Sequence, residues 1–299
     1  MSKTTTAKPV IGCIGQGYVG KSYADAIEAK GYEVIRYSLE QKYVANKPRM
    51  RECDVVFIAV PTPTNAKGFD GGMVESTLEL LKKGATAVIK STVIPGTTAK
   101  LQKKFPHLFV MHSPEFLVAR TAGQDALTPK RSIIGIPRAT KAFKERAQQA
   151  LEILPRAPFE RIVSAEEAEL VKYGGNFFLF LKVIFGNLLY EAAEAAGANY
   201  DVIRECIGAD PRIGPSHLQV VHDSGHRGAK KGRGAGGICF IKDVEALRKF
   251  YDSNVKEKRG GAILDAVIAK NVDLLMKSRK DLDLLVQTYP TLAKKRARR

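Results

Sequence analysis

Tryptophan is absent from the 299 residues, and cysteine occurs only at positions 13, 53, 206 and 239. No two of these cysteines form a C-x-x-C pair, so the sequence indicates neither a zinc site nor a disulfide framework. No apolar run approaches the ~20 residues of a membrane-spanning helix, and residues 1–8 are polar, unlike a signal peptide. We therefore expect a cytoplasmic protein without a membrane partner.

Acidic residues are too few to balance the basic ones. Lysine and arginine number 48 against 31 aspartates and glutamates, which gives a net charge of +17. Such an excess indicates either a polyanionic partner or a solvated basic surface, and nucleic acid is the less favoured partner. The basic tail 294–299 resembles a nucleic-acid patch in composition, a pattern that is equally typical of a frayed terminus.

Short apolar runs alternate with helical patterns through the first half of the chain. The expected strands are 10–14, 33–37, 55–60, 87–90, 108–111 and 132–136, and the expected helices are 19–30, 73–83 and 97–105. This alternation predicts an α/β fold with a Rossmann-like, doubly wound, mostly parallel sheet. We expect a dinucleotide-binding domain over residues 1–164.

The second half of the sequence is helical. One long stretch of helix formers, 165–196, begins after a capping box formed by Ser164 and Glu167, and Gly197 is suited to its C-terminal end. Further helices are expected at 200–207, 244–252 and 262–286, with a glycine- and lysine-rich loop at 223–237. We expect an all-helical domain with a long central helix over residues 165–299.

A glycine motif follows the first expected strand and begins the first expected helix, in the order Gly15-Gln16-Gly17-Tyr18-Val19-Gly20. In this context the pattern predicts a dinucleotide site in which the pyrophosphate meets the helix N-terminus. The acid that usually binds the ribose 2′-hydroxyl of NAD is replaced by Ser38. With Arg36 before it, Ser38 is compatible with NADP; alternatively, Glu40 takes the role of the acid.

Cys239 is the candidate nucleophile. It follows Gly236 and Gly237 in a segment rich in lysine and arginine, where we expect an exposed thiol that favours the thiolate. The other three cysteines lie in apolar or helical contexts and are expected in the core.

Lys172 and Asn176 are four residues apart on the long helix and therefore share one face. A lysine there can stabilise an oxyanion, and an asparagine can hold a substrate or a water molecule. Gly174 and Gly175 lie between them and cost roughly 1 kcal/mol each in a helix, so we expect a ligand or another helix to approach closely.

Six further segments complete a pattern with the glycine motif. They are Val60-Pro61-Thr62-Pro63-Thr64, 91–98, Ser113-Pro114-Glu115-Phe116-Leu117, Glu169-Leu170-Val171-Lys172-Tyr173, Asp210-Pro211-Arg212-Ile213-Gly214 and 236–243. Together they resemble the UDP-glucose/GDP-mannose dehydrogenase family, in the family's order, from Val10 to Val286. The resemblance implies oxidation of the C6 alcohol of a UDP-sugar, such as UDP-glucose, to the uronic acid in two NAD-dependent steps.

The resemblance also implies roles for individual residues. Cys239 would form a thiohemiacetal and then a thioester, Lys172 would stabilise oxyanions, Asn176 and Asp243 would hold water or move protons, and Glu115 would act as general base. Thr92, Pro61 and Thr62 would line the cofactor, with Thr92 close to the reaction. Phe116, Leu117, Arg212, Gly236 and Gly237 would contact substrate. A homodimer through the long helix is implied as well, and six apolar side chains crowd that helix nearly all round.

The sequence departs from the family pattern at several places. Ala119 and Arg120 replace a second glutamate and a glycine, Ile241 replaces a proline, and Ala235 replaces an aromatic residue. The family continues into a second Rossmann-like domain that is not matched here, so nucleotide binding would need another chain, the basic loop 227–233, or weak contacts. Two alternatives follow: a one-step hydroxyacid-type dehydrogenase, or a degraded relative that only binds a cofactor or a polyanion.

Overall fold

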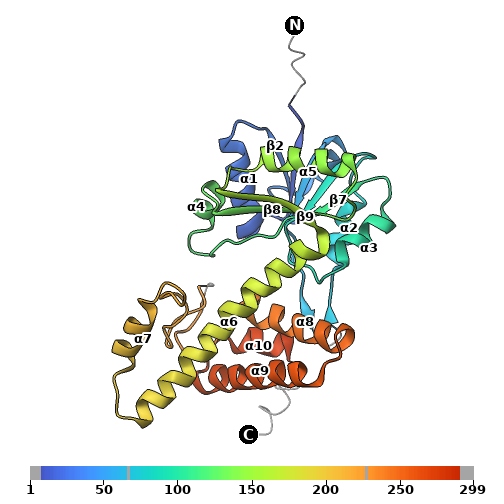
Figure 1. Ribbon diagram of the computed structural model, residues 1–299. Helices are drawn as coiled ribbons and strands as arrows, with labels where there is room; N and C mark the ends of the chain where they lie inside the picture. Colours follow the sequence, from blue (N-terminus) through green and yellow to red (C-terminus); the bar gives the residue numbers. More distant parts are fainter. Residues whose placement is uncertain (1–7, 66–67, 226–227, 290–299) are drawn as a thin grey trace. The chain divides into compact units, whose positions relative to one another are not determined.

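The computed structural model describes residues 8–65, 68–225 and 228–289, in two compact units (Figure 1). The first unit comprises Met1–Thr62 and Asp70–Lys172, and the second comprises Pro63–Phe69 and Tyr173–Arg299. The basic tail 294–299 and Arg227 of the basic loop lie outside the described residues.

A seven-stranded sheet forms the centre of the first unit, in the order β2-β1-β3-β6-β7-β8-β9. Neighbouring strands are parallel except β7 and β8, which are antiparallel. The strands are β1 (Ile11–Ile14), β2 (Val34–Tyr37), β3 (Val55–Ile58), β6 (Thr86–Ile89), β7 (Phe109–His112), β8 (Arg131–Ile136) and β9 (Phe159–Ser164). This topology confirms the predicted Rossmann-like α/β fold.

Helices pack on this sheet and bury its apolar strands. They are α1 (Tyr18–Ala29), α2 (Gly72–Leu78), α3 (Thr97–Lys104), α4 (Ala122–Leu127) and α5 (Lys141–Ile153), with two 3₁₀ helices, η1 (Val44–Asn46) and η2 (Pro48–Glu52). Side chains of α1, α4 and α5 share one core with β1, β3 and β7, as the apolar stripe of α1 predicts. The sequence did not predict α4, α5, β9, η1 or η2.

The second unit is helical apart from one short hairpin. Its elements are α6 (Ala165–Ala195), which begins in the first unit, α7 (Tyr200–Gly208), α8 (Ile238–Asn254), α9 (Lys258–Ser278), α10 (Leu282–Thr288) and the hairpin of β4 (Thr64–Asn65) and β5 (Gly68–Phe69). Phe180 and Ile184 of α6 pack with Val244 of α8 and Ile268 and Leu274 of α9. The elements described between residues 165 and 289 are all helices, as predicted, whereas the hairpin comes from residues 64–69, which the sequence had assigned to the first domain.

The ends of α6 agree with the sequence. The backbone N–H of Ser164 donates to Glu167 Oε2 at 2.7 Å, and the N–H of Glu167 donates to Ser164 Oγ at 3.2 Å. Gly197 follows the helix with φ at +67°, a conformation in which glycine is favoured. Both the capping box and the glycine cap are confirmed.

Two helix boundaries in the second unit differ from the prediction. Helix α8 begins at Ile238, six residues before the expected start, so Cys239 lies in the first turn of a helix. The helix expected over 262–286 is broken into α9 and α10 by residues 279–281. Arg279 and Asp281 in this break have φ values of +54° and +50°.

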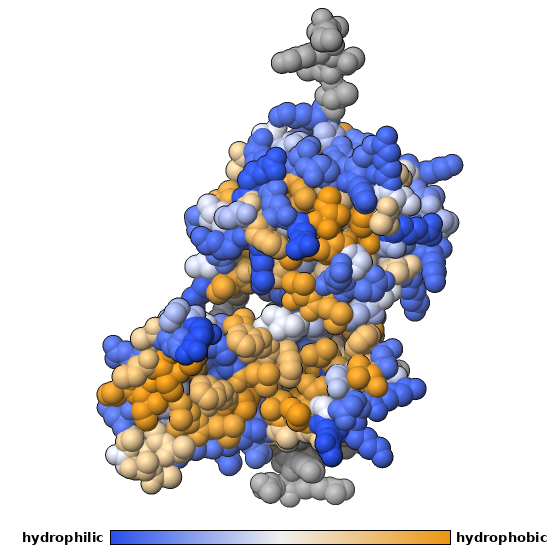
Figure 2. All heavy atoms as spheres, in the orientation of Figure 1, coloured by the Kyte–Doolittle hydropathy of each residue, from blue (hydrophilic) through white to orange (hydrophobic). Residues whose placement is uncertain are grey.

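The apolar residues around α6 suggested a helix buried on all sides. In the structure, one side of α6 is exposed. Phe178, Phe185 and Leu188 are 60%, 46% and 51% exposed. Their spacing of seven and three residues places them on one side of the helix. Figure 2 shows apolar residues gathered on the visible face of the second unit.

By length and composition alone, α6 is long and apolar enough to cross a membrane. The core helix of a soluble protein can have the same length and composition. No other described segment approaches Gly174 of the glycine pair in α6, since an added Cβ there would meet no described atom within 4 Å apart from its chain neighbours and its own helix backbone; the alternative, approach of a ligand, stays a prediction.

Candidate functional site

The glycine motif has the geometry that a dinucleotide requires. Gly15 has φ at +88°, and a Cβ there would lie 2.3 Å from the carbonyl oxygen of Ala59. A Cβ at Gly20 would lie 1.9 Å from the carbonyl oxygen of Gly15, whereas one at Gly17 would meet no described atom within 4 Å. The first glycine thus makes the turn, the third permits close packing, and space is left over the second for a pyrophosphate. Tyr18 and Val19 form the first turn of α1.

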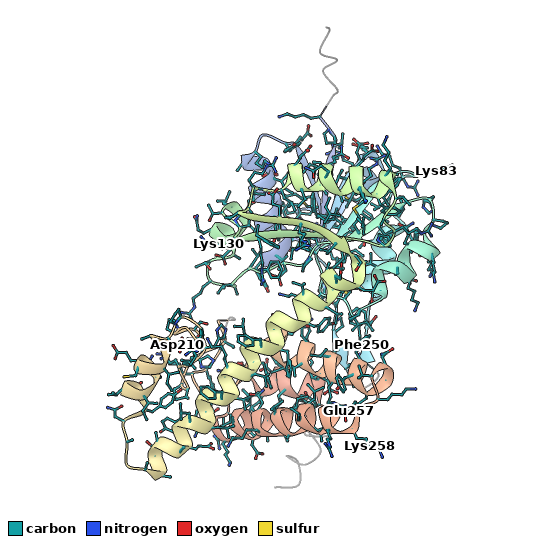
Figure 3. All side chains as sticks on the ribbon, viewed as in Figure 1. Lys83, Lys130, Asp210, Phe250, Glu257 and Lys258 are labelled. Atoms are coloured by element: carbon teal, nitrogen blue, oxygen red, sulfur yellow. The ribbon has the colours of Figure 1, made fainter. Side chains whose placement is uncertain are left out.

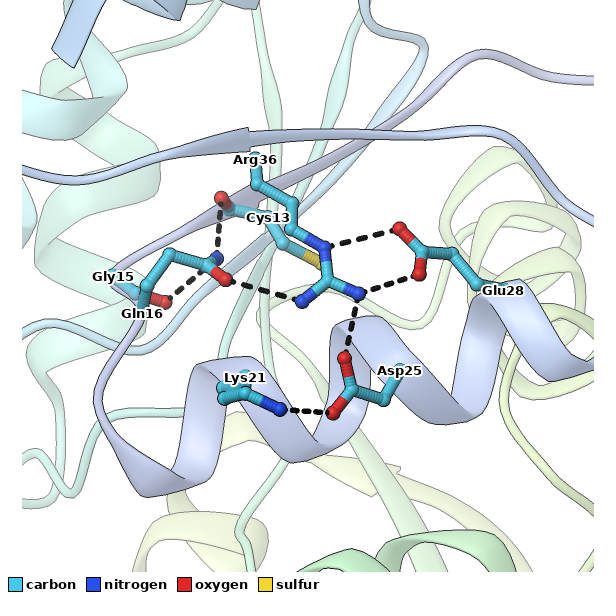
Figure 4. A network of polar contacts seen from close by, with 7 residues as sticks. All are labelled: Cys13, Gly15, Gln16, Lys21, Asp25, Glu28 and Arg36. Atoms are coloured by element: carbon cyan, nitrogen blue, oxygen red, sulfur yellow. Dashed lines mark hydrogen bonds and ion pairs between the residues drawn. The ribbon is translucent and has the colours of Figure 1, made fainter. Parts of the chain in front are cut away.

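Arg36, beside the missing ribose acid, is held by two carboxylates of α1 (Figure 4). Its guanidinium donates to Asp25 Oδ1 at 2.7 Å and to Glu28 at 2.5 and 3.0 Å, and its Nη1 lies 3.5 Å from Gln16 Oε1. Its positive charge is therefore already neutralised where a 2′-phosphate would need it. The Oγ of Ser38 accepts the backbone N–H of Glu40 at 3.3 Å.

Two loops, at the carboxyl ends of β3 and β6, are hydrogen-bonded to each other. Thr62 Oγ1 donates to the carbonyl oxygen of Thr92 at 2.7 Å, and Ser91 Oγ donates to the carbonyl oxygen of Val60 at 2.7 Å. Ligands of open α/β sheets bind at this edge. The structure thus places Pro61, Thr62 and Thr92 together where the cofactor was expected.

Glu169, on the first turns of α6, fixes the loop that contains Thr92. Its carboxylate accepts the N–H of Gly96 at 2.6 Å and the N–H and hydroxyl of Thr98 at 2.8 and 2.6 Å. Burial raises the pKa of Glu169 to about 7 against the effect of these donors. The sequence marked Glu169 as part of a motif but did not assign it this role.

Lys172, one turn further along α6, reaches the loop after β7. Its Nζ donates to Glu115 Oε1 at 2.7 Å and to the carbonyl oxygen of Glu115 at 2.9 Å, and both side chains are buried. Glu115 Oε2 accepts the N–H of Leu117 at 2.8 Å. Arg131 lies over the ring of Phe116, with its guanidinium carbon 3.7 Å from the ring centroid. The structure brings together Glu115 and Lys172, two of the residues predicted for the site.

A buried polar cluster behind this loop was missed by sequence reasoning. Lys90 Nζ donates to Ser113 Oγ at 2.9 Å and lies 3.9 Å from the ring centroid of Tyr23. Neither ring nitrogen of buried His112 has a hydrogen-bond partner among the residues that the structure describes. Burial lowers the pKa of Lys90 to about 7 and that of His112 to about 3. In the sequence, Lys90 and His112 are single polar residues next to apolar strands, and nothing there indicates that they lie in one buried cluster.

Cys239, the candidate nucleophile, lies in the second unit together with Asn176 and Asp243. Cys239 is partly exposed in the first turn of α8, two residues after Gly237. Asp243 follows it by four residues on the same helix, is only 2% exposed, and accepts a hydrogen bond from Asn176 Nδ2 at 2.6 Å. Lys242 also pairs with Asp243, so the buried carboxylate has both an amide and an ammonium beside it.

Arg212, the expected substrate ligand, lies on the turn after α7. Its guanidinium donates to both carboxylate oxygens of Asp210, which Figure 3 labels beside this helix. Lys182 of α6 supports the same turn by donating to the carbonyl oxygens of Ile213 and Gly214 at 2.8 and 3.3 Å. The Arg212 side chain is 88% exposed and therefore accessible.

The remaining cysteines differ in exposure. Cys13 and Cys53 are buried, and burial raises the pKa of their thiols to about 12 and about 11, which makes them unreactive. Cys206, expected in the core, is exposed on α7 because it lies on the outer side of an amphipathic helix. Basic residues such as Lys83, Lys130 and Lys258 are exposed on both units (Figure 3).

The chain matches known proteins along most of its length. The NAD-binding domain of the UDP-glucose/GDP-mannose dehydrogenase family matches residues 42–153, and the central domain of that family matches residues 166–272. A putative UDP-glucose 6-dehydrogenase of Bacillus subtilis is 30% identical over 79% of this chain and 61% of its own length. The UDP-glucose 6-dehydrogenase of Rickettsia conorii is 29% identical over 85% of this chain and 58% of its own. The chain thus spans about three fifths of these curated relatives.

Solved structures agree with this assignment. A UDP-glucose dehydrogenase from Pyrobaculum islandicum superposes with a TM-score of 0.75 and 26% identity, covering 91% of this chain and 69% of that one. A UDP-D-ManNAc dehydrogenase from Pyrococcus horikoshii shares the fold, with a TM-score of 0.73 at 21% identity over 88% and 68% of the two chains. With both family domains matched in order, the chain belongs to the UDP-glucose/GDP-mannose dehydrogenase family.

Proposed function

We propose that this protein oxidises the C6 alcohol of a UDP-sugar, such as UDP-glucose, to the uronic acid in two NAD-dependent steps. The observation that carries the proposal is the arrangement on α8. Cys239 lies in the first turn of the helix, and buried Asp243 lies one helical turn further along, where it accepts a hydrogen bond from Asn176 of α6. A thiol at a helix N-terminus suits covalent capture of an aldehyde, and a carboxylate one turn further along can take part in proton transfer.

The side chains of the second unit would act in sequence. NAD, when bound, would supply the acceptor for the hydride that the sugar carbon loses in each step, and Asp243 would pass the proton of the oxidised hydroxyl group on to water. Cys239 Sγ would add to the aldehyde carbon to give a thiohemiacetal, whose oxidation leaves a thioester. Water would then attack the thioester carbon, releasing the acid and restoring the thiol. Asn176 and Asp243 would hold this water, and Glu115 would take up its proton.

The side chains of the first unit would stabilise charge and assist hydrolysis. We propose that Lys172 donates to oxyanionic intermediates and that Glu115 acts as the general base, with Thr92 beside the reacting carbon. The ion pair of Lys172 and Glu115 supports these roles, since it holds both groups ready in a buried site. Ala119 leaves Glu115 without the family's second glutamate, so Glu115 would carry water activation alone.

The coenzyme is proposed to be NAD rather than NADP. The neutralised guanidinium of Arg36 supports this choice, because two carboxylates beside it would repel a 2′-phosphate. Glu40, exposed after the end of β2, is the acid available to the ribose.

Substrate binding would rest on the backbone of Phe116, Leu117, Gly236 and Gly237 and on the side chain of Arg212. The exposed apolar side of α6 supports a homodimer through that helix. We propose a cytoplasmic location, with which four free thiols agree. Nucleic acid stays an alternative partner that the net charge permits.

Product stoichiometry tests this function. Purified protein would be given UDP- and GDP-sugars with NAD or NADP, and the reduced coenzyme would be counted against the sugar acid formed. The proposal predicts two NADH per uronic acid from a UDP-sugar. One NADH per oxidised product would indicate a one-step dehydrogenase, and no turnover with salt-sensitive retention of nucleic acid would indicate a degraded binding protein.

A further inference from the structure

The turn 279–281, which breaks the helix expected over 262–286, has an unusual backbone conformation and two buried charged residues. Arg279 and Asp281 both adopt φ values near +50°, which residues other than glycine seldom adopt. Lys280 between them is 0% exposed, and Asp281 is 5% exposed. Backbone strain of this kind persists where the surroundings fix the conformation, and it marks functional positions.

The turn is hydrogen-bonded to the backbone of the glycine loop 232–237. Lys280 Nζ donates to the carbonyl oxygens of Gly234 at 2.9 Å and of Gly232 at 3.4 Å. Asp281 Oδ2 accepts the N–H of Gly237, the residue that caps α8, at 2.8 Å. Two charged side chains thus hold the loop from its start to the residue that precedes the helix.

Asn271 of α9 holds the middle of the same loop. Its Oδ1 accepts the N–H of Ala235 at 2.7 Å, and its Nδ2 donates to the carbonyl oxygen of Ala235 at 3.0 Å. These two bonds satisfy both backbone polar groups of Ala235, as the pairing with a strand neighbour would. At its start the loop is paired by an antiparallel bridge between Gly232 and His222.

The turn and the loop pack so closely that Gly232 and Gly236 leave no room for a side chain. A Cβ at Gly236 would lie 2.0 Å from Asp281 Oδ2, and one at Gly232 would lie 2.9 Å from the Cβ of Lys280. Gly237 has φ at +81° and ψ at 153°, a conformation open to glycine alone. Cys239 follows this residue by two positions, so the loop fixes where its sulfur is presented.

Packing alone does not explain a buried ammonium at position 280. An apolar side chain of the same length would fill the space without the cost of removing a charge from water. Burial lowers the pKa of Lys280 to about 8, with Asp281 and Asp223 acting in the opposite direction. The ammonium is explained by the two loop carbonyl groups that need donors.

We infer that Asn271, Lys280 and Asp281 are positioning residues that hold the glycine loop so that α8 presents Cys239 for attack. None of the three belongs to the motifs that identify the family in this sequence. The inference rests on the proposed function in one respect, which is that Cys239 is the nucleophile.

Alkylation of Cys239 by iodoacetamide in the full-length chain tests this inference without any need for turnover. Peptide mass spectrometry would give the rate at Cys239, with exposed Cys206 on α7 as the internal reference. In Asp281→Ala the first turn of α8 loses its anchor, and the Cys239-to-Cys206 rate ratio is expected to fall about tenfold, the factor for one lost hydrogen bond. Lys280→Met is expected to act in the same direction.

Matched variants separate positioning from general damage. Asp281→Asn keeps an acceptor and tolerates positive φ, so it should keep the ratio within about twofold of wild type. The exposed neighbours offer Asp283→Ala and Lys277→Met as controls, which should leave the ratio unchanged. Where Asp281→Ala does not fold, Asp281→Ser keeps a polar group that is too short to reach Gly237.

The outcomes are distinct for the two claims. An unchanged or raised ratio in folded Asp281→Ala and Lys280→Met would overturn the positioning role. A wild-type protein without sugar-nucleotide turnover but with the expected alkylation pattern would overturn the proposed function alone. If turnover is present, Asp281→Ala should lower kcat and leave the KM for NAD unchanged, since the coenzyme motif lies elsewhere in the sequence.

Discussion

The ammonium of Lys172 lies 2.7 Å from a carboxylate oxygen of Glu115, and both side chains are less than one-tenth exposed. Breaking a buried pair leaves one charge without compensation, which costs roughly 3–5 kcal/mol. Lys172→Met should therefore lower the free energy of unfolding by about 3 kcal/mol and lower kcat at least ~100-fold. Urea denaturation and steady-state kinetics measure the two effects.

A double-mutant cycle separates stability from catalysis at this pair. Lys172→Met combined with Glu115→Gln should recover most of the stability but none of the activity. The exposed pair of Arg49 and Glu52 supplies the control, where Arg49→Met should cost at most ~1 kcal/mol. Additive losses in the double variant would contradict a coupled pair.

Coenzyme choice is expected to depend on the acids that hold Arg36. In Asp25→Asn/Glu28→Gln the guanidinium is released, so we expect NADPH to bind at least ~10-fold more tightly than to wild type. Titration of coenzyme fluorescence gives the Kd values for NADH and NADPH. Glu33→Gln, exposed and outside this network, should change neither. A wild-type protein that prefers NADPH would refute the proposed selection.

Stability should depend on pH through Lys90. Its pKa falls from 10.5 to about 7 on burial, so the unfolded chain binds more protons between these values. The free energy of unfolding should therefore rise with pH across this window, by at most ~1.4 kcal/mol per unit from this group. Lys90→Met should flatten that rise between pH 7 and 9 in urea titrations. Lys83→Met, an exposed control, should keep the wild-type slope.

The exposed side of α6 gives a prediction about assembly. Phe178→Glu places a charge on the apolar stripe that would face a second copy. The dissociation constant of the dimer should therefore rise at least ~10-fold. Sedimentation equilibrium measures this directly. Ile263→Glu on α9, a position that is also 60% exposed, serves as the control. A wild-type chain that is monomeric at all concentrations would contradict the homodimer.

Local signals in the sequence predicted much of the fold. The glycine motif, the capping box of Ser164 and the glycine at 197 each encode a backbone conformation within a few residues, and all three occur in the structure. The strand and helix periodicities of the first unit were equally local. These features depend on neighbouring residues alone, so one sequence suffices to find them.

Contacts between distant segments could not be predicted in this way. The early start of α8 depends on the bond from the N–H of Gly237 to Asp281, forty-four residues along the chain. The pairing of Lys90 with Ser113 and the hold of Glu169 on Gly96 have the same non-local origin. Whether Phe178 and Cys206 are exposed depends on which faces of α6 and α7 pack against other elements. The apolar composition of a helix does not show which of its faces is packed.

Mass spectrometry of quenched turnover tests the central claim most directly. Wild-type and Glu115→Gln protein would be mixed with UDP-glucose and NAD, acid-quenched, and digested. The account predicts an acyl adduct on the Cys239 peptide at the oxidation level of the acid, more abundant in Glu115→Gln because hydrolysis is slowed. Uronic acid formed with no adduct on Cys239, and equally well by Cys239→Ser, would contradict it.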